Sequence, residues 1–173
     1  MWDFGHADSI EPEAIGEPGE RRFRIRVMAR LESASLWLEK EQVAALALAL
    51  RRLLEQTKPA EEPIEPEPVM GASFPEMPDV EFRPSRLGIG HDDEATSISI
   101  FAYDPETAEE EDPKPAFSCQ VSRGQARAFA RRAEEIINAG RPVCVLCGLP
   151  IDETTGHKCL RRNGHAGPSA SLG

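Results

Sequence analysis

One pattern constrains the fold of this chain more than any other: apolar and polar residues alternate as in a strand, and the spacing then changes to that of a helix. The first occurrence begins with Phe23, Ile25 and Val27, which alternate with arginines. A second strand is predicted at 35–38, and residues 41–56 carry one apolar stripe at helical spacing. We interpret the arginines as the charged outer face of an antiparallel sheet, in preference to a binding stripe.

The pattern occurs again in the second half of the chain. Strands are predicted over 82–89, 97–102 and 117–121, and a helix over 123–138. Ser122 stands three residues before a glutamine, which is the Ser-x-x-Gln spacing of a capping box and predicts the start of this helix. Each half therefore reads as strands followed by one amphipathic helix.

The two halves align without a gap when Gln42 is placed on Gln125. Ala45 then meets an identical alanine, and apolar positions meet apolar positions. We predict an α+β fold in which two pseudo-repeated strand-strand-strand-helix units form an antiparallel sheet covered by two helices. Chance similarity between two amphipathic helices is the alternative. The alignment also sets Cys119 on an apolar strand position, so we interpret it as a core residue and not as a metal ligand or reactive thiol.

Prolines and glutamates separate the two halves. The proline-rich segment, residues 58–80, holds six prolines, which cannot donate ladder hydrogen bonds, and it is predicted to be an extended connector. The predicted organisation is a body over 1–140, with halves at about 10–57 and 81–139, followed by a metal-binding tail over 141–173.

The charge of the chain is unevenly distributed. Its formal net charge is −10, and residues 61–115 alone hold sixteen acidic and three basic residues. Because nucleic-acid affinity depends on neutralising phosphates, this composition argues against a general DNA or RNA binder.

No apolar run has the length of a membrane span, and the first residues lack a signal-like apolar core, so we expect a cytosolic protein. The acidic segments 59–80 and 104–115 are expected to be mobile surface.

The tail contains the strongest chemical signal, a Cys-x-x-Cys-Gly motif followed nine residues later by His-x-Cys. We predict one structural zinc ion with four ligands: Cys144, Cys147, His157 and Cys159. Four protein ligands leave no open coordination position, so the site is predicted to be structural and not catalytic. His165 is an alternative fourth ligand. We prefer His157, because Gly156 before it permits the close approach that a His-x-Cys pair requires.

Several of these motifs together resemble a known family. They lie at residues 16–19, 22–23, 38–46, 125–130 and 140–142, and in the cysteine motif of the tail. The chain resembles a bacterial family of unknown function, the domain of unknown function numbered three thousand and ninety. The resemblance implies a cytosolic protein with the same cysteine motif and implies no activity, although phosphomutase-like and kinase-like neighbours on bacterial chromosomes imply a shared pathway. The family reads Asn-Gly-Tyr after the last cysteine, whereas this chain has His165 in place of the tyrosine.

Three classes of function follow from these features. We favour a non-enzymatic interaction module whose tail presents Lys158, Arg161 and Arg162 to a protein partner. The first alternative is a nucleic-acid or nucleotide-binding accessory protein that uses the same cations. The second is an enzyme or enzyme subunit linked to phosphoryl chemistry, with residues 91–94 as its candidate acid-base or metal cluster. We interpret that cluster as a hairpin turn, because consecutive side chains diverge, and the chain has no glycine-rich phosphate loop.

Overall fold

The computed structural model describes residues 1–17, 19–61, 64–139, 144–149, 151 and 158–159. Within them the elements follow the order β1 (Trp2–His6), β2 (Ser9–Ile15), β3 (Arg22–Ala29), β4 (Glu32–Leu38), α1 (Lys40–Gln56), β5 (Val80–Phe82), β6 (Arg86–His91), β7 (Ser97–Tyr103), β8 (Phe117–Ser122) and α2 (Arg123–Asn138). Each half contains four strands followed by a helix, one strand more than the sequence predicted, and the α+β class is confirmed. None of the described helices has the length and apolar character needed to cross a membrane.

The strands form two sheets, which differs from the one antiparallel sheet expected from the sequence. One sheet has the order β1-β8-β7-β6 and the other β2-β3-β4-β5. In each sheet three strands form an antiparallel meander, and the fourth strand is parallel to its neighbour: β1 pairs with β8, and β5 with β4. The strand that precedes each meander therefore joins the sheet of the other half. This exchange ties the two halves into one body.

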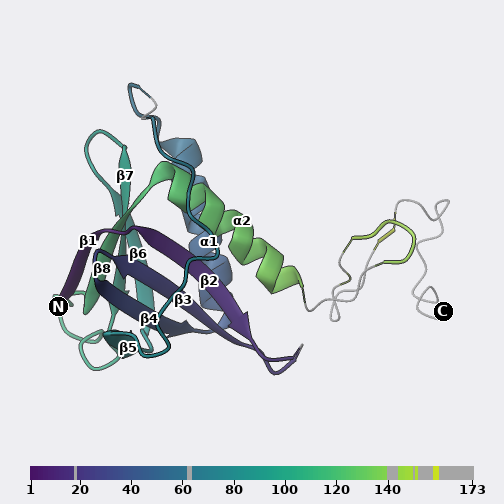
Figure 1. Cartoon of the computed structure of the whole chain (residues 1–173), viewed down its shortest axis with the longest axis horizontal. Coiled ribbons are helices and arrows are strands. Elements are labelled where there is room, and N and C mark those ends of the chain that lie inside the picture. Colours follow the sequence, from purple (N-terminus) through teal and green to yellow (C-terminus); the bar gives the residue numbers. More distant parts are fainter. Residues whose placement is uncertain (18, 62–63, 140–143, 150, 152–157, 160–173) are drawn as a thin grey trace.

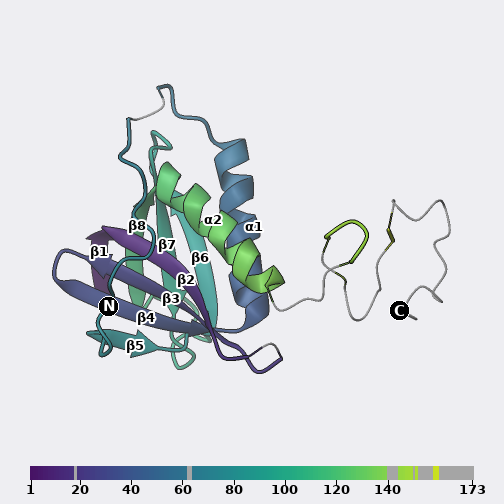
Figure 2. The same ribbon diagram turned by 45° about the vertical axis from the view of Figure 1, so that its right-hand side comes forward.

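One hydrophobic core contains residues of both sheets and both helices. The predicted alternation is confirmed in β3, where Phe23, Ile25 and Val27 are each at most 5% exposed. Phe129 of α2 and Cys119 of β8 are each 1% exposed, which confirms Cys119 as a core residue. Figures 1 and 2 show the two helices side by side against the sheets.

A glutamine ties each helix to the other half of the chain. In α1, the amide group of Gln42 donates to the carbonyl oxygens of residues 84 and 85, at 3.4 and 3.3 Å. In α2, Gln125 donates to the carbonyl oxygens of residues 7 and 8, at 2.9 and 3.3 Å. Both glutamines also complete a capping box at the start of their own helix, as predicted for the second. Each glutamine therefore fixes the segment that leads into the opposite meander.

The buried guanidinium of Arg123 joins the start of α2 to the end of α1. Arg123 is 2% exposed. Its Nη2 donates to the carbonyl oxygens of Leu54 and Thr57, at 3.0 and 2.8 Å, and its Nη1 donates to Thr57 Oγ1 and to the Ala95 carbonyl, at 3.2 and 3.1 Å. The last carbonyl groups of a helix lack partners within it and carry partial negative charge, so a cation satisfies them well.

The described part of the proline-rich segment makes several side-chain contacts with the body. Asp79 accepts hydrogen bonds from the N–H and hydroxyl of Ser33, at 2.8 and 2.9 Å. Phe74 lies under the guanidinium of Arg26, 4.2 Å from its ring centre. Ser33 is only 3% exposed, although its side chain belongs to the face of the sheet that was predicted to be wet. Side chains make these contacts, so the missing N–H groups of the prolines do not prevent them.

Candidate metal centre

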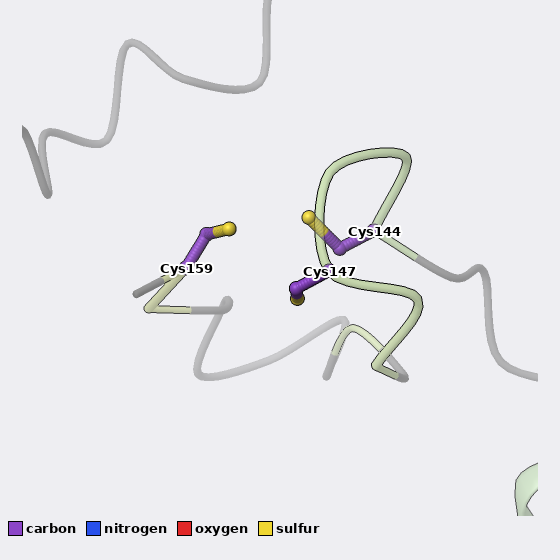
Figure 3. Close-up of side chains that lie close together, drawn as sticks. All are labelled: Cys144, Cys147 and Cys159. Carbon is purple, nitrogen blue, oxygen red and sulfur yellow. The ribbon is translucent and has the colours of Figure 1, made fainter. Parts of the chain in front are cut away.

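Three cysteines from two separate segments meet after α2. The Sγ atoms of Cys144, Cys147 and Cys159 lie within 4.8 Å of one another, and Figure 3 shows the Cys159 side chain pointing toward the 144–147 loop. Sulfur ligands about 2.3 Å from a tetrahedral zinc ion stand about 3.8 Å apart. The three thiols are therefore close enough to bind one metal ion.

Local backbone hydrogen bonds form the loop that carries the first two thiols. The Gly148 N–H donates to the Cys144 carbonyl at 2.8 Å, and the Cys144 N–H donates to the Leu149 carbonyl, also at 2.8 Å. Gly148 has a φ of 72°, in the left-handed region that residues with a Cβ rarely adopt. This glycine thus allows the tight turn that the Cys-x-x-Cys-Gly motif predicted.

The same loop stabilises a thiolate. Hydrogen bonds from the backbone N–H of Cys147 and then of Leu146 lower the pKa of the Cys144 thiol to about 6. At neutral pH Cys144 is therefore largely ionised, which is the form that binds metals. The N–H groups are oriented by the turn itself, so they act before any metal arrives.

The structure brings together three of the four predicted ligands. His157 and the alternative ligand His165 lie outside the described residues. The remaining cysteine, Cys119, is in the core of the body, where burial, with a smaller contribution from the charge of Asp3, raises the pKa of its thiol to about 12. Cys119 is therefore protonated and inert at neutral pH, as expected for a packing residue.

The candidate acid-base cluster at residues 91–94 closes the hairpin between β6 and β7. The carboxylate of Asp92 accepts hydrogen bonds from the Ser97 N–H at 2.9 Å and from Thr96 Oγ1 at 2.5 Å. These bonds, led by that from Ser97, lower the pKa of Asp92. His91 directs its Nδ1 to the Asp92 carbonyl, at 2.7 Å. These contacts support the interpretation of the cluster as a structural turn.

The arginine stripe of β3 packs against neighbouring side chains. The guanidinium groups of Arg22 and Arg24 lie over the Trp37 ring, 4.2 and 5.1 Å from its centre, and Arg24 also pairs with Glu13 at 2.5 Å. Sequence reasoning did not foresee Trp37 in this role. Its position on the adjacent strand, with the same outward parity, was the available signal.

The fold and the cysteine cluster define an α+β protein with a candidate metal centre beyond its last helix. The chain belongs to the family described as "Protein of unknown function (DUF3090)", whose model matches residues 2–159. The match includes the whole body and ends at the third cysteine of the cluster. No curated protein and no solved structure matches the chain.

Proposed function

We propose that this protein is a non-enzymatic interaction module in which one structural zinc ion folds residues 144–159 into a rigid knuckle. The convergence of Cys144, Cys147 and Cys159 supports this proposal most directly. Soft thiolate ligands in tetrahedral arrangement favour zinc over the harder divalent ions. The hydrogen-bonded Cys144 thiolate gives the ion a preformed first ligand.

A fourth ligand would close the coordination sphere of the ion. His157 precedes Cys159 by two residues and would complete a Cys₃His set, with His165 as the competing candidate. A closed set of four protein ligands leaves no position for a reacting water or substrate. The ion would therefore stabilise the knuckle and supply no chemistry.

The charge of the knuckle indicates what kind of partner it binds. Lys158 is exposed, and the sequence places Arg161 and Arg162 two and three residues after the last cysteine. Lys158 within the knuckle and the two arginines just after it act together, so we propose a protein partner with an acidic surface patch. The acidic body of the chain has the opposite charge and would not compete with the knuckle for such a patch.

The test is affinity capture from native lysate without chelators, with the metal content of each bait measured in parallel. Cys147→Ser should lose the zinc ion and the partner, whereas the double variant Arg161→Glu and Arg162→Glu should keep the ion and lose the partner. A control that reverses two charges of the body, Lys58→Glu with Lys114→Glu, should retain both. A partner that still binds Cys147→Ser would refute the proposed role of the knuckle.

A further inference from the structure

Three of the four edge strands carry a feature that hinders pairing with another chain. Strand β5 has only three residues, β2 contains Pro12, and β1 contains Gly5 at a φ of 58° within a shift of register between Asp3 and His6. Short strands, prolines and irregularities of this kind protect sheet edges from association. The fourth edge strand, β6, has none of them. It pairs with β7 in continuous register from Arg86 to His91.

Three residues of β6 direct their backbone N–H and C=O groups toward the open edge of the strand. The Asp92 N–H donates to the Ser97 carbonyl, at 3.3 Å, so the backbone groups of Asp92 point toward β7. Alternate residues of a strand direct these groups to opposite sides. Leu87, Ile89 and His91 therefore direct their N–H and C=O groups away from β7, where no described strand pairs with them.

An apolar groove runs beside this open edge. It lies between α1 and β6, has a volume of about 290 Å³, and includes Ala45, Ala49, Leu87 and Ile89 in its lining. It continues toward Leu48, whose side chain is 41% exposed. Burying this surface would add a hydrophobic contribution to any pairing at the edge.

The corresponding surface of α2 already has a neighbour from the chain itself. Ala128 and Arg132 take the places of Ala45 and Ala49 when Gln42 is aligned with Gln125. They lie beside residues 70–71 of the proline-rich segment. On α1, the described part of the proline-rich segment does not line the groove. The edge and the groove thus form one uncovered surface.

We propose that β6 pairs with β6 of a second copy of this chain, in antiparallel orientation about a two-fold axis. The charges at the ends of the strand favour this partner, because Arg86 begins it and the acidic residues 92–94 follow it. Placing Ile89 opposite its counterpart sets Arg86 opposite Asp92 of the second copy. The same register sets Leu87 opposite His91, so all the outward-directed backbone groups find partners. The β1-β8-β7-β6 sheet of one copy and that of the second copy then become one sheet of eight strands.

Sedimentation velocity of the full chain, over a hundredfold range of protein concentration, tests the proposal. The wild type should form a concentration-dependent dimer. His91→Pro should weaken the dimer at least tenfold, because proline removes an N–H that points to the open edge and none that pairs with β7. Arg86→Glu should weaken it comparably by placing like charges opposite each other. Glu81→Lys, on the β5 edge, is the control and should leave the dimer unchanged.

Hydrogen exchange locates the interface independently. The amides of Leu87, Ile89 and His91 should gain protection as the protein concentration rises, while those of β5 should not. If circular dichroism shows that His91→Pro does not fold, the Arg86→Glu variant and the hydrogen-exchange data test the proposed dimer instead. A wild type that stays monomeric throughout, including one whose edge binds a peptide of another protein, overturns the proposal. A dimer that neither variant weakens also overturns it.

Discussion

Replacing Arg123 with alanine should destabilise the body more than any exposed substitution. The guanidinium makes four hydrogen bonds to the end of α1 and to the Ala95 carbonyl while being only 2% exposed. Alanine would leave three carbonyl groups, one buried and two partly buried, and one hydroxyl without this donor. Removing the arginine side chain would also leave a cavity between the two helices.

The magnitude follows from these contacts. Each hydrogen bond contributes about 1 kcal/mol net, and the desolvation that the buried cation no longer incurs offsets part of the sum, so the free energy of unfolding should fall by about 3 kcal/mol. For a chain of this size the melting temperature should fall by roughly 6–12 °C. Arg123→Lys keeps the charge but loses the planar fork of donors, so it should lose about half as much.

Urea unfolding followed by circular dichroism measures the difference. Arg132→Ala is the matched control, because Arg132 lies on the same helix with its side chain half exposed and forms a surface ion pair with Glu135. Its effect should stay within about 0.5 kcal/mol. If Arg123→Ala costs no more than the control, the desolvation of the guanidinium cancels its hydrogen bonds. The reasoning would then be refuted.

Three further predictions concern the thiols, the acid response and the tail. In metal-free native protein, a thiol reagent at pH 8 should modify three cysteines and spare Cys119, whose pKa is raised to about 12 by burial; modification of all four before unfolding would contradict this. Hydrogen bonds from the side chain and backbone of Ser33 lower the pKa of Asp79, so its contribution to stability is present at neutral pH and is lost as pH falls below about 4. Asp79→Asn should therefore be less stable than the wild type at pH 7 and should lose less stability on acidification, as measured by unfolding at several pH values. Deleting 141–173 should leave a cooperatively folded body by circular dichroism, because the core as described ends at Ile137, and an unfolded product would place the tail within the core.

The sequence predicted the elements whose apolar pattern extends over enough residues to be recognised. The β3 alternation, the α1 stripe and the capping box at Ser122 each depend on neighbours within a few residues, and all three are found in the structure. Strand β5 has three residues, too few for alternation to show, and Phe4 is the only buried residue of the five in β1, so that strand shows no alternation. Their exchange between the halves depends on tertiary contacts such as those of Gln42 and Gln125, which no local pattern encodes.

The candidate site was predictable in its ligands and not in its electrostatics. The spacing of Cys144, Cys147 and Cys159 identified the cluster because turn geometry fixes where a Cys-x-x-Cys pair points. The lowered pKa of Cys144 depends on the orientation of two N–H groups, which no sequence pattern encodes. In the same way, Arg123 reads as an ordinary first residue of a helix, and its burial depends on the end of α1 lying against it.

X-ray absorption at the zinc edge, with metal quantification, tests the central claim most directly. Protein purified without chelators should contain one zinc ion per chain, with three sulfur ligands at about 2.3 Å and one nitrogen ligand at about 2.0–2.1 Å. His157→Ala should remove the nitrogen ligand, and His165→Ala should leave it in place. A spectrum unchanged by His157→Ala would assign the nitrogen to another residue. Protein that contains no zinc, or that keeps its zinc after Cys147→Ser, would contradict the metal centre itself.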